Sequence, residues 1–178
     1  QATTPHESEW DAGEIVPGLW VGGLSAAENE DELIRRCISS VVTVGTRLQP
    51  QVSWTSVKSQ SIANKRYDIE DHPHADLLQI IPSAIRAIDK VMKGRSKKES
   101  DARTGVLVHC ASGMSRSVAV CIAWLMLRCK MSLDDAHEMV KAGRPVARPN
   151  FGFMQSLRLL EERKDVRLAQ DKWTRSNK

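Results

Sequence analysis

A cysteine and an arginine six positions apart carry the most informative chemistry of this chain. Cys110 and Arg116 lie near the two ends of the segment His109–Ser117. A thiolate is a nucleophile, and a planar guanidinium can donate to two phosphate oxygens at once, which a lysine ammonium cannot. Both groups on one short segment predict a site that binds a phosphate and attacks it.

The flanks of this segment predict how the two groups are positioned. Val106–Val108 is typical of a short buried strand, and Val118–Leu127 is an unbroken apolar run typical of a buried helix. A loop that enters a helix presents unpaired backbone N–H groups, and the helix dipole favours negative charge there. Gly113 can adopt the conformations that an anion-binding turn needs. We therefore expect a lowered pKa for Cys110 and a thiolate near neutral pH.

The segment His109–Ser117, HCASGMSRS, resembles the HCxxGxSRS signature of the dual specificity protein phosphatases, within the cysteine-dependent protein tyrosine phosphatase superfamily. Ala123–Met126 (AWLM) is similar to the AYLM motif that follows this loop in the family. Arg148–Met154 resembles the PNxxF segment that begins its last helix. The resemblance covers roughly residues 14–164 and implies a small, atypical member, with no docking domain in this chain and no metal or other cofactor.

The resemblance also implies roles for the loop residues. Ser117 would donate a hydrogen bond to the Cys110 sulfur and help it to leave, although a serine is also an ordinary residue of a first helical turn. His109 would orient the loop through its hydrogen bonds rather than act as a base. The phosphate would be bound by the residues between the nucleophile and the helix: Ala111, Ser112, Gly113, Met114, Ser115 and Arg116.

A leaving alkoxide or phenolate needs a proton, and three aspartates are candidates for the general acid: Asp68, Asp71 and Asp76. The family places its acid six residues before a leucine that opens a long helix, and Asp71 with Leu77 matches that spacing. Asp76, directly before Leu77, has the position of a helix N-cap. Asp68 remains an alternative, either as the acid or as part of a solvated loop. Asp71 is the predicted acid.

These groups imply a reaction in two steps. Cys110 attacks the phosphorus while Asp71 protonates the leaving oxygen, which gives a cysteinyl-phosphate intermediate. Asp71, now a carboxylate, then activates a water that hydrolyses the intermediate. Arg116 and the loop amides hold the charge of the transition state.

The length and composition fit one domain, because 178 residues with 41% hydrophobic and 27% charged residues are close to the globular average. We expect a flexible N-terminal segment over 1–12 with Trp10 as a possible anchor, a catalytic domain over 13–166 and a C-terminal tail over 167–178. The apolar run Val118–Leu127 is too short to span a bilayer, and the N-terminus shows no secretory signal pattern.

The remaining cysteines and two histidines have structural interpretations. Cys37, Cys121 and Cys129 lack the spacing of a zinc site or a disulfide framework, so we expect them to be buried in core helices. This cysteine usage favours a reducing, intracellular location in the cytoplasm or the nucleus. His72 and His74 have no matching cluster of ligands, so a loop is preferred over a metal site.

Strands alternating with helices predict the fold class. We expect a single α/β domain whose central, mostly parallel, twisted sheet of about five strands is flanked by helices on both faces, with the phosphate-binding loop at the carboxyl end of a strand. Pro82 predicts a kink or a late start in one helix. The predicted strands are Glu14–Gly22 (with a turn at Pro17–Gly18), Ile38–Val44 and Val57–Ile62; the predicted helices are Ser25 (capping box with Glu28) to about Arg36, 76–93, Ser115 to about Cys129, Ser132 to about Lys141, and Asn150 into the tail.

The net charge of +4 suits acidic or phosphorylated partners, and it is too small to indicate nucleic acid binding. Relatives that act on lipids commonly carry lysines inside the loop, and this loop has none, which favours phosphorylated proteins as substrates, at phosphotyrosine and at phosphoserine or phosphothreonine. Phosphoinositide, RNA 5′-triphosphate or glucan phosphatases and a phospho-dependent scaffold remain alternatives. Arg148 is either the ligand of a second phosphate or an ordinary surface residue. The oligomeric state is not predicted.

Overall fold

The computed structural model describes residues 10–51, 62–94 and 104–163, and within them five strands form one sheet. The strand order is β1-β2-β5-β3-β4, and β1 alone pairs antiparallel with its neighbour. The predicted α/β fold with a mostly parallel sheet is confirmed. The strands are β1 (Ala12–Val16), β2 (Leu19–Gly22), β3 (Ile38–Val44), β4 (Ala63–Tyr67) and β5 (Gly105–His109).

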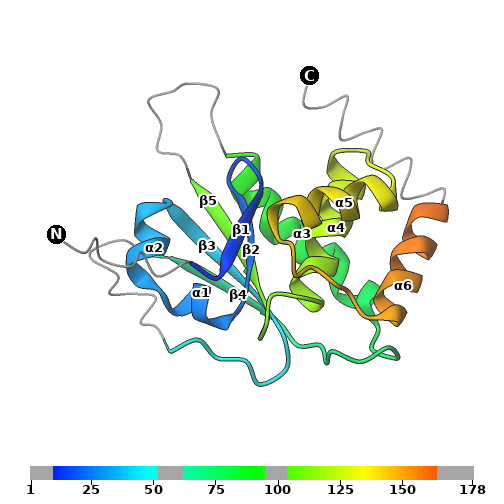
Figure 1. Cartoon of the computed structure of the whole chain (residues 1–178), viewed down its shortest axis with the longest axis horizontal. Coiled ribbons are helices and arrows are strands. Elements are labelled where there is room, and N and C mark those ends of the chain that lie inside the picture. Colours follow the sequence, from blue (N-terminus) through cyan, green and yellow to red (C-terminus); the bar gives the residue numbers. More distant parts are fainter. Residues whose placement is uncertain (1–9, 52–61, 95–103, 164–178) are drawn as a thin grey trace, which may run out of the picture.

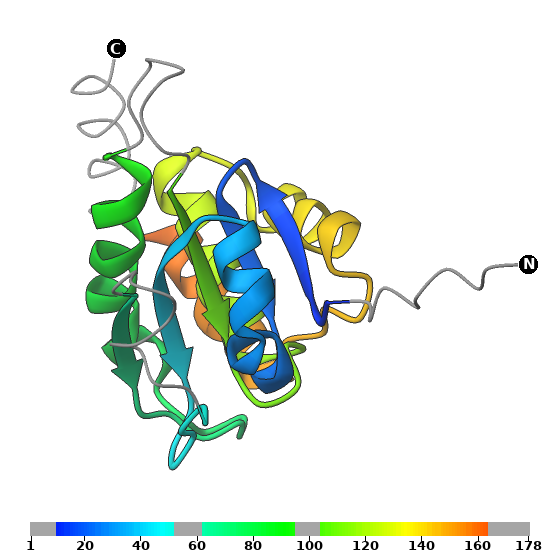
Figure 2. The same ribbon diagram turned by 90° about the vertical axis from the view of Figure 1, so that its left-hand side faces the viewer.

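Helices cover both faces of the sheet (Figures 1 and 2). Alternate residues of β3 point to opposite faces, so Val42 packs into one core and Val41 into the other. The larger core lies under the four longest helices, and the smaller one contains Trp10 and the residues that α1 and α2 bury. The helices are α1 (Leu24–Glu28), α2 (Glu30–Arg35), α3 (Leu77–Met92), α4 (Arg116–Arg128), α5 (Leu133–Gly143) and α6 (Phe151–Glu162).

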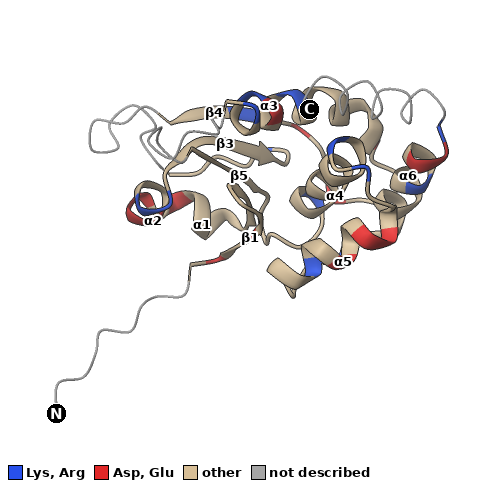
Figure 3. Cartoon of the chain, turned by 90° about the horizontal axis from the view of Figure 1, so that it is seen from above, with Lys and Arg blue, Asp and Glu red and all other residues tan. Residues whose placement is uncertain are grey.

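Helix α4 is the central helix of the domain. It buries every residue from Ser117 to Leu127 and packs against α3, α5, α6 and β5. An apolar surface on all sides is what a fully enclosed helix requires. Because β5 ends at His109 and α4 begins at Arg116, the loop between them lies at the carboxyl end of the central strand. The inner strands β2, β3 and β5 carry no Lys, Arg, Asp or Glu, and the charges lie mainly on helices and loops (Figure 3).

The N-terminal part of the fold differs in detail from the prediction. The segment Glu14–Gly22 contains two strands joined at Pro17–Gly18, and β1 starts already at Ala12. Residues 10–12 therefore belong to the fold, and the predicted flexible segment over 1–12 extends too far. Trp10 is buried and donates its indole N–H to the Ala26 carbonyl at 3.1 Å, as expected of an anchor.

The predicted helix from Ser25 to Arg36 is in fact two short helices. Gly23 occupies the N-cap position of α1, and the Ser25 hydroxyl donates to Asp11 Oδ2 at 2.9 Å, so the predicted capping box is wrong. The chain breaks at Asn29, whose side chain accepts the Glu32 N–H at 3.1 Å and thereby caps α2. A local asparagine cap thus replaces a continuous helical turn.

The helices α3, α5 and α6 begin within a residue of the predicted positions. Asp76, Ser132 and Asn150 accept backbone N–H groups at the starts of α3, α5 and α6. Pro82 lies inside α3 but does not delay its start, because the Asp76 cap and the buried Leu77 already hold the first turn. The strand predicted over Val57–Ile62 falls almost entirely outside the described residues, and the edge strand β4, which pairs with β3 on the side away from β5, is Ala63–Tyr67.

Two of the three remaining cysteines are not buried. Cys37 is exposed in the turn after α2, where its φ is 54°, and Cys129 is exposed at the C-cap of α4. The prediction of burial in core helices is therefore wrong for these two, since both residues follow the last packed turn of a helix. Cys121, within α4, is fully buried as expected. None of the described helices is long and apolar enough to cross a membrane.

Candidate active site

The loop Cys110–Arg116, here called the phosphate loop, connects β5 to α4. Cys110 is fully buried at its start, and its Sγ accepts a hydrogen bond from the Ser117 hydroxyl at 3.2 Å. Burial raises the pKa of the Cys110 thiol, but the Ser117 hydroxyl, the backbone N–H groups of Ser117 and Gly113, and the charge of Arg116 together lower it below its ordinary value. The predicted lowering of the Cys110 pKa is therefore found in the structure.

The start of α4 keeps its backbone donors available for an anion. Ser115 occupies the N-cap position, but its side chain does not cap the helix. It donates instead to Asp71 Oδ1 at 2.7 Å. Gly113 has a φ of 65°, and a Cβ there would lie 2.4 Å from the carbonyl carbon of Gly22, so this turn requires glycine. The loop and the helix start thus have the backbone geometry that an anion-binding turn requires.

Arg116 lies at the mouth of this turn with unused donor capacity. Its Nη1 donates weakly to the Ile69 carbonyl at 3.5 Å, whereas its buried Nε has no hydrogen-bond partner among the described residues. A Cβ at Gly45 would lie 2.9 Å from Nη1, so glycine at that position leaves room for the guanidinium. A buried, unpaired N–H is costly, and a bound oxyanion would satisfy it.

Asp71 is the one of the three candidate acids that reaches the phosphate loop. Besides Ser115, Asn150 donates to its Oδ1 at 2.9 Å, and its Oδ2 lies 3.9 Å from Arg116 Nε. Asp68 instead pairs with Arg66 at the surface, and Asp76 caps α3. The structure thus brings together Cys110, Arg116 and Asp71 and leaves the other two aspartates outside.

His109 lies fully buried beneath the loop. Its Nδ1 is 3.2 Å from the Cys110 carbonyl, which can only accept, so this nitrogen carries the proton. Its Nε2 then accepts from the Thr43 hydroxyl at 2.8 Å. Burial lowers the pKa of His109 to about 4, so the ring is neutral at physiological pH and links β3 to the backbone of the loop.

Sequence reasoning missed Arg144 and Asp11, which support the loop from outside. Arg144 Nε donates to the Gly113 carbonyl and Nη2 to the Ser112 carbonyl, both at 3.1 Å. The same Nη2 lies 2.5 Å from Asp11 Oδ1. No local pattern reveals this cluster, because its members lie 133 positions apart. Asn150 was recognised only as a helix start, although its side chain also reaches Asp71.

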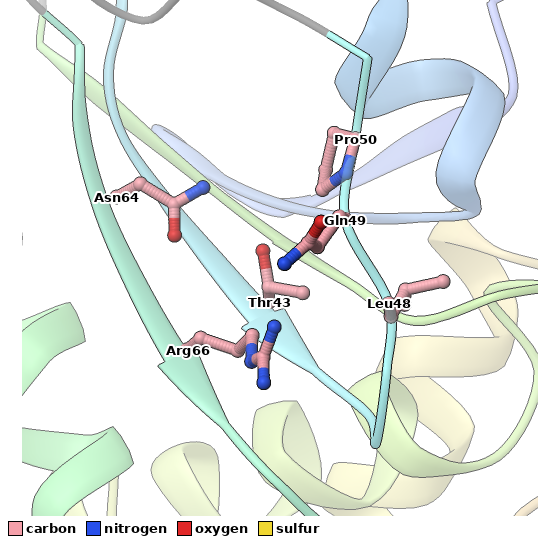
Figure 4. Close-up of a pocket in the computed structure, with 6 residues that line it drawn as sticks. All are labelled: Thr43, Leu48, Gln49, Pro50, Asn64 and Arg66. Atoms are coloured by element: carbon pink, nitrogen blue, oxygen red, sulfur yellow. The ribbon is translucent and has the colours of Figure 1, made fainter.

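A pocket of about 310 Å³ lies near the carboxyl ends of β3 and β4 (Figure 4). Thr43, the partner of His109, forms part of its wall, and the side chains of Asn64 and Gln49 face it. Leu48, from the same wall, has a methyl group 3.3 Å from a Cβ built at Gly45, beside Arg116. The pocket therefore adjoins the outer side of the residues that position the phosphate loop.

The other sequence candidates lie apart from the loop chemistry. His72 and His74 have ring centroids 5.2 Å apart, and the structured parts of the chain contain no group of three or more residues that could hold a metal ion. Arg148 donates its backbone N–H to the Met114 carbonyl at 2.7 Å while its side chain is exposed. The backbone of Arg148 therefore lies beside the phosphate loop.

Comparison with known proteins agrees with this geometry. Residues 19–163 match the family model of the dual specificity phosphatase catalytic domain. The chain belongs to the dual specificity phosphatase family. It is 35% identical to human dual specificity phosphatase 28 over 83% of this chain and 76% of that protein. It is 36% identical to human dual specificity protein phosphatase 7 over 81% of this chain but only 32% of that longer protein.

Solved structures of this family have the same fold. The crystal structure of human DUSP28 superimposes with a TM-score of 0.74 at 32% identity, covering 85% of this chain and 93% of that one. A human tyrosine phosphatase-like serine/threonine/tyrosine-interacting protein superimposes with a TM-score of 0.73 at 26% identity, covering 86% of this chain and 97% of that one. The domain is accordingly a dual specificity protein phosphatase domain of the metal-independent, cysteine-dependent class.

Proposed function

We propose that this dual specificity phosphatase domain hydrolyses phosphotyrosine and phosphoserine or phosphothreonine in proteins through a cysteinyl-phosphate intermediate. The observation that carries the proposal is the convergence of three groups at one loop: the Cys110 thiol with its lowered pKa, the Arg116 guanidinium, whose Nε has no hydrogen-bond partner among the described residues, and the Asp71 carboxyl group. Each group serves a different need of phosphoryl transfer, namely a nucleophile, a ligand for the phosphoryl oxygens and a proton donor.

The first step transfers the phosphoryl group to sulfur. The phosphomonoester binds with its oxygens on the loop N–H groups and the Arg116 guanidinium, which neutralise the charge that develops on them. Cys110 Sγ attacks phosphorus as the bond to the leaving oxygen breaks. Protonated Asp71, held by Ser115 and Asn150, gives its proton to that oxygen.

The second step returns the enzyme to its starting state. Asp71, now ionised, takes a proton from the attacking water, and the phosphorus–sulfur bond breaks as inorganic phosphate forms. The thiolate is the leaving group here, and the Ser117 hydroxyl at 3.2 Å donates to it. His109 is neutral and faces the Cys110 carbonyl rather than the sulfur, so it orients the loop and takes no proton in the reaction.

Protein substrates are favoured over phosphoinositides, 5′-triphosphate RNA and glucan phosphates. The loop residues between Cys110 and Arg116 carry no lysine that would pair with further phosphates. A scaffold without turnover is the alternative with structural support, because one similar fold belongs to a protein described as phosphatase-like and interacting. The complete set of nucleophile, guanidinium and acid supports turnover in this chain.

A turnover panel tests the proposal. The purified chain, without added metal, is given a small aryl phosphate, phosphotyrosyl and phosphothreonyl peptides, phosphoinositides and a 5′-triphosphate RNA. We expect hydrolysis of the aryl phosphate and of both peptides, and loss of all turnover in Cys110→Ser. Phosphopeptide binding without any turnover by the unmodified chain would instead establish the scaffold.

The assignment of the acid has a matched control. Asp71→Asn is expected to lower kcat by about 10²- to 10⁴-fold, most strongly for substrates with poor leaving groups. Asp68→Asn removes a neighbouring carboxylate that pairs with the exposed Arg66 at the surface, so kcat stays near that of the unmodified chain. A large loss of kcat in Asp68→Asn with little change in Asp71→Asn would identify Asp68 as the acid instead.

A further inference from the structure

Large hydrophobic side chains that remain exposed gather beside the phosphate loop. Across the described residues, four such side chains stand out: Met114 (38% exposed), Val146 (49%), Phe151 (68%) and Leu159 (55%). Isolated exposed apolar residues are common and need no explanation. Three of these four, however, belong to the phosphate loop or to the segment that runs from the end of α5 to the start of α6.

Hydrogen bonds hold that segment against the catalytic residues. The Arg148 N–H donates to the Met114 carbonyl at 2.7 Å, and the Asn150 N–H donates to the Ser115 hydroxyl at 3.0 Å. The Asn150 side chain reaches the carboxyl group of Asp71 at 2.9 Å. Phe151 follows Asn150 directly, so its exposed ring lies next to a residue that is hydrogen-bonded to the predicted acid, Asp71.

The position of these side chains points to the substrate as their partner. A phosphorylated residue bound in the loop brings its neighbours along, and each residue of an extended peptide adds only about 3.3 Å. The residues next to the phosphorylated one must therefore pass over the rim of the site. On the side of α6 this rim presents apolar groups that already face solvent.

We propose that Met114, Val146 and Phe151 form a docking surface, here called the apolar rim, for an apolar side chain next to the phosphorylated residue of a protein substrate. The inference rests on the proposed phosphatase function and adds a preference in sequence. Burying one apolar side chain of the peptide on this surface removes hydrocarbon from water on both partners, and such contacts discriminate by about tenfold or more.

The test compares three phosphotyrosyl peptides that differ only in the residues next to the phosphotyrosine, which are Leu, Ser or Glu. We expect kcat/KM to be about tenfold higher for Leu than for Ser in the unmodified chain. The double variant Val146→Ser, Phe151→Ser should lose that ratio and keep its kcat/KM for a small aryl phosphate, which does not reach the rim. Met114 stays unchanged, because it belongs to the phosphate loop.

Leu159→Ser is the matched control. Leu159 is as exposed as the rim residues and lies on the same helix as Phe151, but eight residues further on, which is about 12 Å along the axis. This variant should keep the full preference for Leu. A general effect of surface hydrophobicity would lower the preference in both variants and would overturn the inference.

The outcomes separate this inference from the proposed function. If the unmodified chain hydrolyses the aryl phosphate but treats Leu, Ser and Glu peptides alike, the apolar rim is not a docking surface and the phosphatase assignment stands. A preference for Glu would also overturn it and would point to the exposed Arg148. Failure on the aryl phosphate itself would refute the function on which the inference depends.

Discussion

At the scale of single residues, the chemistry depends on donors that overcome burial. Cys110 is shielded from solvent, and burial by itself raises the pKa of a thiol. The hydroxyl and the backbone N–H of Ser117, the N–H of Gly113 and the charge of Arg116 act in the opposite direction and prevail. The nucleophile is therefore sheltered from solvent and yet loses its proton more readily than an ordinary cysteine, and the side-chain donor of Ser117 can be tested by mutation.

Ser117→Ala is expected to raise the pKa of the Cys110 thiol, because it removes the side-chain donor that contributes most to lowering it. The measurement is the rate of alkylation by iodoacetamide as a function of pH, with the exposed Cys37 as an internal reference. The profile of Cys110 should shift to higher pH while that of Cys37 does not move. The variant should also show a larger burst of phenol release, since the intermediate then has a poorer leaving group. An unchanged profile for Cys110 would show that Ser117 does not lower the pKa of its thiol.

At the scale of elements, the phosphate loop keeps its shape through segments that are distant in sequence. The N–H groups of such a loop face the anion, so its carbonyls face outward. Arg144, just after α5, donates hydrogen bonds to two of these carbonyls and ties them to Asp11 ahead of β1. We infer that Arg144 is a positioning residue, which acts on the reaction through the loop and not through the substrate.

Arg144→Met should lower kcat/KM for an aryl phosphate by about 100-fold, because small displacements of catalytic groups cost that much. Arg144→Lys should have a kcat/KM between those of the unmodified chain and of Arg144→Met, since an ammonium keeps the charge but does not reproduce the guanidinium geometry. Lys141→Met removes an exposed charge from the last turn of α5 and is the control; its kcat/KM should match that of the unmodified chain. The thiol pKa of Cys110 should rise in Arg144→Met. Loss of thermal stability with normal kinetics and a normal thiol pKa would show that Arg144 is merely structural.

The contrast between local and distant contacts explains which features the sequence could predict. The helix starts at Asp76, Ser132 and Asn150 and the strand Ile38–Val44 depend on neighbouring residues, and the structure has them where the sequence predicts them. The cap at Ser25 failed because its hydroxyl is drawn to Asp11, a tertiary partner. The second bond of Asn150, to Asp71, likewise arises only when the chain folds. Local physics therefore predicts the elements, and tertiary packing decides how they meet at the site.

At the scale of the whole molecule, His109 connects the catalytic loop to the stability of the fold. It lies at the end of the central strand, and its two ring nitrogens bond to Thr43 of β3 and to the Cys110 carbonyl. Burial disfavours the charged, doubly protonated ring and lowers the pKa of His109 from 6.5 to about 4, although the hydrogen bond to the Cys110 carbonyl acts in the opposite direction.

This shift makes the fold sensitive to acid in a defined range. Between pH 6.5 and about 4 the unfolded chain binds a proton at His109 while the folded domain does not, so the free energy of unfolding falls as the pH falls. The full loss from this residue is about 3 kcal/mol, at 1.36 kcal/mol for each pKa unit.

Urea unfolding of the unmodified chain and of His109→Gln at a series of pH values measures this contribution. Carboxylates such as Glu32, whose pKa is lowered by its bond to Arg35, titrate in both proteins and cancel in the difference. We expect His109→Gln to be less stable at pH 7.5, because glutamine cannot reproduce both ring contacts, and the gap to narrow by about 3 kcal/mol as the pH approaches 4. A gap that stays constant across this range would mean that His109 titrates alike in the folded and unfolded chain. That result would contradict the assignment of His109 as a buried, neutral ring beneath the phosphate loop.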